Sequence, residues 1–296
     1  MKHGALQEIT TASQSDVGRV RAQNEDHCDE FFRSDGQRLL VVADGMGGHA
    51  GGTVASHLAV DTMGAVFLHS ASDAATLMGE AFAAANHAVH DAADRDAGLR
   101  GMGCTTVALL FSHDGATWVA HVGDSRAYRV REGRIEALTH DHSVVAELVR
   151  RGHITEEEAR VHARRNEILR SIGVEATAVP DIAPVEVCAG DRFVLCSDGL
   201  TSFVEDEEIA AVVSREHPQQ AVATLVALAN ARGGSDNVTV QVAAIPGPRE
   251  GLATGERPGP TASRTHAEPR VRTIALTTAF VSVMLAAAVA WLAWSH

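Results

Sequence analysis

The feature that most constrains this chain is an apolar run that ends in a carboxylate and a glycine-rich turn. Residues 39–43, Leu-Leu-Val-Val-Ala, are long enough for one buried strand, and Asp44 follows them directly. The sequence Gly-Met-Gly-Gly-His comes next, at residues 45–49. An acid at the end of a buried strand is fixed by rigid backbone and directed toward a cleft, as a reactive group requires. We therefore expect Asp44 to belong to a functional site.

The same pattern recurs three times farther along the chain. Apolar runs lead into Gly-Asp-Ser at residues 123–125 and into Ser-Asp-Gly at residues 197–199, and Asp236 precedes the apolar run that begins at Val238. A single aspartate beside a strand is usually a turn residue or a helix cap. Four such acids, each next to glycine or serine, instead predict that the carboxylates converge on one metal centre.

The segments around these acids predict a mixed α and β domain. Turn sequences at residues 113–115 and 132–133 favour hairpins. The consecutive runs at 104–112, 116–122 and 126–131 are joined by short turns, so they are expected to pair antiparallel. Helix pairs between the groups of strands indicate two packed sheets with helices on the outer faces, and not a doubly wound parallel sheet. Predicted strands cover residues 38–43, 104–112, 116–122, 126–131, 192–197 and 237–245, and predicted helices cover residues 53–69, 73–95, 206–214 and 217–231. Residues 150–180 have little apolar content and are expected to form a mobile surface insertion.

The charge balance excludes nucleic acid as an expected partner. The 296 residues include 25 basic and 38 acidic side chains, which gives a formal net charge of −13. Proteins that bind a phosphate backbone need a basic face. Bound cations would neutralise several of these acids, so the working protein is expected to be less negative than the formal charge.

The composition changes after residue 245, so the globular domain is expected to cover residues 8–245. Residues 246–272 are rich in proline, glycine, threonine and charge, which predicts a disordered linker. Residues 273–294 are 22 residues without a charge. As a helix they would span about 33 Å at about 1.5 Å per residue, enough for a hydrocarbon core of about 30 Å. We therefore expect a C-terminal transmembrane helix at residues 273–294.

The flanks of this segment predict its orientation. Trp291 and Trp294 fit an interfacial aromatic belt, and Arg264, Arg270 and Arg272 lie on the N-terminal flank. The positive-inside rule then places the large domain in the cytoplasm, as part of a single-pass protein of the cell inner membrane. A buried or amphipathic C-terminal helix is the alternative, and it is disfavoured because no face of the segment is polar.

The set of acids suggests a site that binds metal ions and activates a water. Oxygen ligands suit hard cations such as Mg²⁺ or Mn²⁺. Two such ions about 3.5–4 Å apart can bridge and acidify a water, which then attacks phosphorus without a covalent enzyme intermediate. Glu25 and Asp26 add two further acids, and Arg21 lies four residues before Glu25. Its guanidinium is suited to hold two oxygens of a phosphate, although an arginine alone is more often an ion-pair partner.

A dinucleotide-binding loop is the competing interpretation of the glycines. Residues 45–50 satisfy the G-x-G-x-x-G/A pattern between a strand and a helix. Two observations disfavour it. The predicted helix at 53–69 is followed by another helix and not by a second strand, and Asp44 would repel a pyrophosphate.

Taken together, the motifs resemble those of the bacterial metal-dependent, type 2C serine/threonine protein phosphatases. The resemblance covers roughly residues 8–245, with the motifs in the same order. The residues that carry it are Asp16-Val17-Gly18 with Arg21 and Asn24-Glu25-Asp26, then residues 44–49, Gly103-Cys104-Thr105-Thr106, Gly123-Asp124-Ser125-Arg126, Ser197-Asp198-Gly199-Leu200 and Ser235-Asp236-Asn237-Val238-Thr239.

The resemblance implies an α+β fold, a four-layer α-β-β-α sandwich of two mainly antiparallel sheets with two metals in the cleft between them. By this resemblance Asp44 bridges both metals and the carbonyl of Gly45 is a ligand. Asp198 and Asp236 are implied to ligate the other metal.

The resemblance also implies roles for the remaining residues. Glu25 and Asp26 are expected to act through metal-bound waters, and Asp124 to bind a third, weaker metal together with Asp198. Arg21 matches the arginine that binds the substrate phosphate. Residues 150–180 resemble a flap beside the cleft that influences substrate choice.

The identity of the general acid stays open. Eukaryotic members of the family have histidine directly after Asp-Gly, whereas this chain has Met46 there and His49 three residues later. Either His49 or a metal-bound water is the candidate for protonating the leaving alkoxide, and a loop or helix-capping histidine is an equal alternative.

The expected function is hydrolysis of phosphoserine and phosphothreonine on proteins at a binuclear Mg²⁺ or Mn²⁺ centre, with the third, weaker ion that the resemblance implies. The implied partners are a Hanks-type serine/threonine kinase and its substrates. The alternative is a catalytically silent binding module of the same fold, scaffolded at the membrane. The alternative is disfavoured because every expected metal acid is present.

Overall fold

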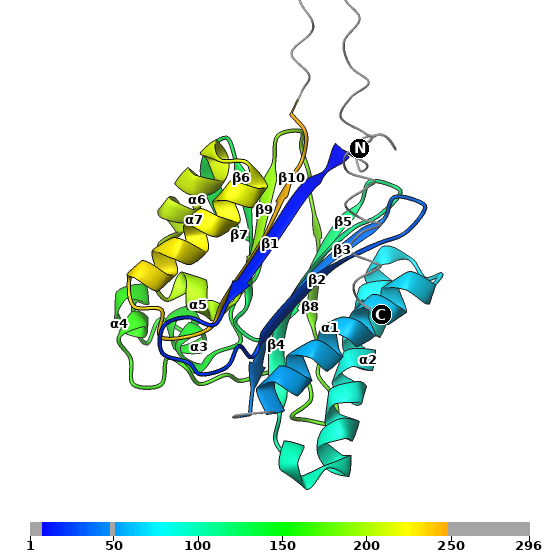
Figure 1. Cartoon of the computed structure of the whole chain (residues 1–296), viewed down its shortest axis with the longest axis vertical. Helices are drawn as coiled ribbons and strands as arrows, with labels where there is room; N and C mark the ends of the chain where they lie inside the picture. Colours follow the sequence, from blue (N-terminus) through cyan, green and yellow to red (C-terminus); the bar gives the residue numbers. More distant parts are fainter. Residues whose placement is uncertain (1–7, 48–50, 248–296) are drawn as a thin grey trace, which may run out of the picture. The chain divides into compact units, whose positions relative to one another are not determined.

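The computed structural model describes residues 8–47 and 51–247, and their strands form two five-stranded sheets (Figure 1). Every neighbouring pair of strands is antiparallel. In spatial order, the first sheet contains β2 (Asp26–Phe32), β3 (Arg38–Met46), β4 (Gly103–Phe111), β5 (Thr117–Val122) and β8 (Asp181–Val185). The second contains β1 (Thr10–Asp16), β10 (Val238–Ala244), β9 (Arg192–Cys196), β6 (Arg126–Arg131) and β7 (Arg134–Ala137).

Two pairs of helices cover the outer faces of the sheets. Helices α1 (Gly51–His69) and α2 (Ala74–Arg95) lie on the first sheet, and α6 (Asp206–Arg215) and α7 (Pro218–Ala231) lie on the second (Figure 1). This arrangement is the predicted four-layer α-β-β-α sandwich. The shorter helices are η2 (Ala97–Leu99), α3 (Val144–Arg150), α4 (Glu156–Arg160) and α5 (Asp198–Thr201).

The buried apolar side chains divide into three layers. One cluster joins α1 and α2 to the first sheet, and includes Met63 and Phe82. A second joins α6 and α7 to the second sheet. The third lies between the sheets, where Phe111 and Phe193 meet edge to face with ring centroids 5.7 Å apart. The inter-sheet layer fixes the spacing of the two sheets, and with it the spacing of the acids at their ends.

Local sequence signals place the element ends close to where they were expected. The Asp73 side chain caps α2 by accepting a hydrogen bond from the Thr76 amide at 3.1 Å. The hairpin between β6 and β7 has Glu132 and Gly133 at φ of 51° and 77°, values typical of a type I′ turn.

Two expectations about the strands were wrong. The runs at 116–122 and 126–131 follow each other closely but do not pair, because the chain crosses from the first sheet to the second at Gly123-Asp124-Ser125. The expectation treated a short connection as a hairpin. Strands β2 and β8 were not predicted, because each has exposed or half-exposed residues at most positions.

The expected surface insertion at 150–180 is only partly a surface feature. Ile172 is fully buried, and its backbone pairs with Cys104 on β4 through two hydrogen bonds of 2.8 and 3.0 Å. The segment is therefore fastened to the first sheet near its C-terminal end. Residues 150–180 show no apolar periodicity, because Ile172 is the one fully buried large apolar side chain among them.

Within residues 8–47 and 51–247, no helix is long and apolar enough to cross a membrane. The predicted transmembrane helix at 273–294 lies outside the described residues, as does most of the predicted linker at 246–272. His49 is also outside them.

Candidate metal centre and active site

The predicted acids come from the ends of strands in both sheets. In the first sheet Asp26 begins β2 and lies opposite Asp44 of β3, and Asp124 follows β5. In the second sheet Asp198 follows β9, and Asp236 precedes β10. Figure 1 shows α3, α5 and the loop after β1 together at one end of the sandwich. The ends of the two sheets therefore bring the acids together.

The acids lie close enough to repel one another. The Asp44 carboxylate is repelled by four other aspartates, Asp26, Asp198, Asp124 and Asp236. A direct contact crosses the sheets, because the Ser197 hydroxyl donates a hydrogen bond of 2.7 Å to Oδ2 of Asp26. The structure thus brings together five of the acids that the sequence singled out, with Asp44 in the middle.

Burial and mutual repulsion make this cluster unfavourable while it is ionised. Burial, followed by repulsion from neighbouring aspartates, raises the pKa of Asp26 to about 7 and the pKa of Asp198 to about 6. The same two causes raise the pKa values of Asp44 and Asp124 well above their ordinary range. A group of carboxylates in this state is suited to bind cations, which would remove the repulsion.

Two carboxylate oxygens have no hydrogen-bond partner among the described residues. They are Oδ1 of Asp26 and Oδ1 of Asp198, and both are buried. Buried polar atoms are nearly always paired, so an unpaired oxygen points to a ligand. Oxygens of this kind, one from each sheet, fit the hard cations Mg²⁺ and Mn²⁺.

Gly45 and Gly52 pack against Glu25 and have no space for a side chain. The Gly45 amide donates to the carbonyl of Glu25 at 3.1 Å. A Cβ at Gly45 would lie 2.1 Å from the carbonyl oxygen of Gly52, and a Cβ at Gly52 would lie 2.5 Å from Oε2 of Glu25. Close packing therefore explains these glycines. The antiparallel sheet also lacks the βαβ unit of a dinucleotide site, so that alternative is wrong.

Arg21 lies at the rim of the acid cluster. Its Nη2 contacts Oδ2 of Asp236 at 2.8 Å, and half of its side chain is exposed. The hydrogen bond that Arg21 donates to Asp236 raises the pKa of Arg21, which stays charged. An exposed guanidinium held at the edge of the cleft can turn toward an anionic ligand.

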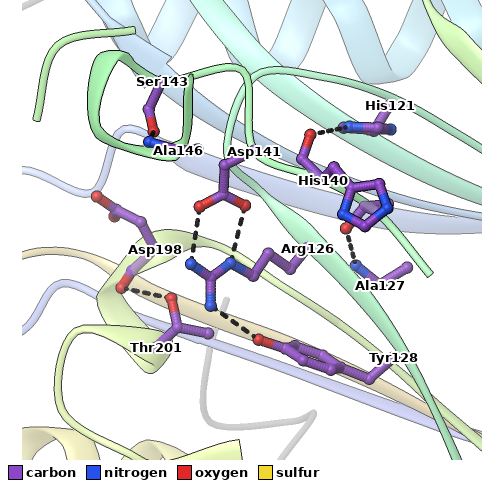
Figure 2. Close-up of polar contacts among 11 residues, drawn as sticks. His121, Arg126, Ala127, Tyr128, His140, Asp141, Ser143, Ala146, Asp198 and Thr201 are labelled. Atoms are coloured by element: carbon purple, nitrogen blue, oxygen red, sulfur yellow. Dashed lines mark hydrogen bonds and ion pairs between the residues drawn. The ribbon is translucent and has the colours of Figure 1, made fainter. Parts of the chain in front are cut away.

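Arg126, two residues after Asp124, is held by Asp141 and Tyr128, which the sequence did not single out. The Arg126 guanidinium donates to both oxygens of Asp141, at 2.9 and 2.7 Å, and to the Tyr128 hydroxyl at 3.1 Å (Figure 2). A bidentate pair of this kind fixes both side chains. Asp141 belongs to the polar run of residues 139–143 between β7 and α3. This run was the one sequence feature that marked the segment, and it did not identify Arg126 as the partner of Asp141.

His142 also holds the turn before Asp124 in place. Its amide donates to the Gly123 carbonyl at 2.9 Å, and its Nδ1 accepts from the Gly123 amide at 3.1 Å. The carbonyl of His142 also accepts from the amide of Leu169 at 2.7 Å. The turn before Asp124 is therefore tied through His142 to the 150–180 insertion.

Among the described residues, one group of histidine and acidic side chains places its ligand atoms within 4.8 Å of one another, and it consists of His121, His142 and Asp181. The two imidazole rings are stacked, with centroids 4.4 Å apart and planes at 23°. Stacked rings do not direct their lone pairs at one ion. Because Nδ1 of His142 is an acceptor, its Nε2 holds the proton. We interpret His121, His142 and Asp181 as a structural support of the Asp124 turn and not as the predicted metal centre.

The sequence profile described as Protein phosphatase 2C matches residues 17–239. The chain belongs to the protein phosphatase 2C family. Among its relatives is the protein phosphatase PhpP of Streptococcus pneumoniae, which is 37% identical over 236 residues, a match that covers 78% of this chain and 95% of PhpP.

Solved structures of the family have the same fold as this member. The serine/threonine phosphatase Stp1 from Staphylococcus aureus superposes with a TM-score of 0.77 at 35% identity, covering 81% of this chain and 96% of Stp1. The catalytic domain of the phosphatase PstP, solved in complex with two manganese ions, superposes with a TM-score of 0.72 at 36% identity, covering 80% of this chain and 98% of that one.

The raised carboxyl pKa values predict a pH-dependent stability of the metal-free protein. A folded-state pKa above the unfolded value means that the folded state holds more protons, so stability falls as pH rises from about 4 toward 7. The lowered pKa values of His121 and His142 act in the opposite direction. A comparison with the Asp26→Asn variant cancels the histidine contribution.

We expect Asp26→Asn to stabilise the chain relative to wild type in EDTA, and increasingly so from pH 5 to pH 8. The difference should reach the order of 1–4 kcal/mol, because each pKa unit corresponds to about 1.4 kcal/mol. Urea unfolding at several pH values measures it. The exposed Asp94→Asn serves as the control. A difference that does not change with pH would contradict the assignment of Asp26 as a buried, destabilised acid.

Proposed function

We propose that this protein is a metal-dependent protein-serine/threonine phosphatase that uses Mg²⁺ or Mn²⁺. The observation that carries the proposal is the meeting of five aspartates from two sheets, with buried oxygens of Asp26 and Asp198 left unpaired. Membership of the family and relatives named as phosphatases support it. The manganese ions of the PstP structure support the choice of metal.

The acids would hold the cations in the arrangement that the family resemblance suggests. Asp44, at the centre of the cluster, is proposed to contact both tightly bound ions, and the carbonyl of Gly45 is proposed as a further ligand. Asp198 and Asp236 are proposed as further ligands of one of them. When bound, the cations supply charge neutralisation and the activation of a water for attack on phosphorus.

The remaining site residues have proposed roles of position and binding. Glu25 and Asp26 would hold ordered water around the ions, and Asp124 would complete a weaker third site with Asp198. Arg21 would leave Asp236 and bind two phosphate oxygens with its guanidinium. This move needs only a rotation of an exposed side chain, because half of Arg21 is already in solvent. His49 is the proposed donor of a proton to the leaving alkoxide, with an ordered water as the alternative.

The proposed substrates are phosphorylated proteins, including those modified by a Hanks-type serine/threonine kinase. The 150–180 insertion contacts the turn before Asp124 through His142, and so lies next to the cluster of acids. That position supports a role for the insertion in choosing among protein substrates.

The enzymatic proposal predicts metal-dependent turnover that depends on the central acid. We expect the full-length protein to hydrolyse p-nitrophenyl phosphate and a phosphothreonine peptide in Mn²⁺ and to be inactive in EDTA. Asp44→Asn should lower kcat at least about 100-fold, because it removes the central negative charge. The exposed Asp94→Asn is the matched control and should keep wild-type turnover.

No turnover by the wild type in Mn²⁺ would favour the silent binding module over the enzyme. Equal activity of Asp44→Asn and wild type would remove Asp44 from the site. Hydrolysis of p-nitrophenyl phosphate without any hydrolysis of phosphopeptides would restrict the proposal to small substrates.

We also propose that residues 273–294 anchor the protein in the cell inner membrane with the phosphatase domain in the cytoplasm. The uncharged stretch and the arginines on its N-terminal flank support this. Full-length protein should sediment with membranes and resist extraction at pH 11, and deletion of residues 273–294 should release it. Recovery of the full-length protein in the supernatant before extraction would contradict the anchor.

A further inference from the structure

We propose that Asn237 is a positioning residue that sets the loop of residues 17–25, and with it Arg21 and Glu25, for phosphate hydrolysis. The inference rests on the proposed function, because it concerns the same site. The Asn237 side chain bonds only to backbone atoms of this loop, so its effect on the reaction is indirect.

The loop needs an anchor because it has little structure of its own. It joins β1 to β2 without a helix or strand. Its backbone lies directly on the turn before β10, where the Arg19 amide donates to the Gly234 carbonyl at 2.7 Å. A Cβ at Gly18 would lie only 2.2 Å from the carbonyl oxygen of Asp236. The position of Arg21 therefore depends on how this loop is fixed to the turn.

Asn237 provides three hydrogen bonds to the two ends of the loop. Its Nδ2 donates to the carbonyls of Val17 and Gln23, both at 2.9 Å. Its Oδ1 accepts from the amide of Glu25 at 2.7 Å. The residue is 5% exposed, so water does not replace these bonds easily.

The hydrogen bonds of Asn237 also connect the loop to the first sheet. The amide of Glu25 is held by Asn237 of the second sheet, and the carbonyl of Glu25 accepts from the amide of Gly45 in the first sheet. Asn237 also follows Asp236, which is the contact of Arg21. The Asn237 side chain therefore holds the loop between the turn that contains Asp236 and the turn that follows Asp44.

The chemistry of the amide explains why this position requires asparagine. Two carbonyls need donors and one amide needs an acceptor, and an asparagine side chain supplies both kinds of group. Aspartate has the same shape but would direct a negative oxygen at two carbonyl oxygens. Serine keeps one hydroxyl and cannot reach all three partners.

The chain contains a matched control in Asn86 of α2. Its Nδ2 also donates to two carbonyls, those of Glu175 and Ala176 at 3.1 Å, and its Oδ1 accepts from the amide of Gly173 at 2.7 Å. It is 2% exposed. Asn86→Asp therefore removes the same kind and number of bonds without touching the loop of residues 17–25.

The test compares Asn237→Asp, Asn237→Ser and Asn86→Asp in the full-length protein. Steady-state kinetics give kcat and KM for p-nitrophenyl phosphate at saturating Mn²⁺. Calorimetry gives the affinity of the Mn²⁺-loaded protein for inorganic phosphate, and hydrogen exchange reports on the loop itself. Thermal unfolding shows how much each variant loses in stability.

We expect both Asn237 variants to exchange faster at residues 17–25 and to bind inorganic phosphate at least about tenfold more weakly, with a raised KM, because the binding group is no longer pre-positioned. Asn86→Asp should lose similar stability and keep phosphate affinity within about twofold of wild type. Wild-type phosphate affinity and loop exchange in both Asn237 variants would overturn the inference. If Asn237→Asp fails to fold, Asn237→Ser decides. Absence of turnover in wild type would overturn the proposed function alone, since exchange and phosphate affinity still test Asn237.

Discussion

Repulsion among the five aspartates is the constraint on which the rest of this structure depends. Burial and mutual charge raise the pKa of Asp26 to about 7 and hold the pKa of Asp44 well above its ordinary range, so the metal-free cleft is an unfavourable arrangement that the fold must support. Apolar packing provides that support, because the inter-sheet layer, which includes Phe111 and Phe193, holds the two sheets against each other. Bound cations would neutralise the carboxylates, and the removal of the repulsion would favour binding.

The turns around the acids are fixed by hydrogen bonds and by close backbone packing. Arg126 holds Asp141 with two hydrogen bonds (Figure 2). Gly123 and His142 exchange two more, so the Asp124 turn cannot move freely. The glycine turn after Asp44 is equally confined, since no side chain fits at Gly45. A cluster of like charges stays assembled only if its supports are rigid, and each turn here has such a support.

Much of this arrangement could be predicted from the sequence, because its signals are local. Asp44, Asp124, Asp198 and Asp236 each follow or precede an apolar run, and the hairpin turns have their own sequence chemistry. Strands β2 and β8 could not be predicted, because a half-exposed strand at a sheet edge lacks a strong apolar pattern. The crossing at Asp124 and the partners Asp141 and Asn237 depend on contacts between distant segments, which one sequence does not reveal. The role of His49 as proton donor and the transmembrane helix at residues 273–294 stay predictions.

The central claim is that these acids bind a pair of metal ions, and electron paramagnetic resonance of the Mn²⁺-loaded protein tests it most directly. Two Mn²⁺ ions that share the Asp44 carboxylate would be spin-coupled, because bridged ions lie about 3.5–4 Å apart. We expect a coupled signal at two equivalents of Mn²⁺ that is lost in Asp44→Asn. A spectrum of isolated Mn²⁺ at every ratio, or a coupled signal that persists in Asp44→Asn, would contradict the account.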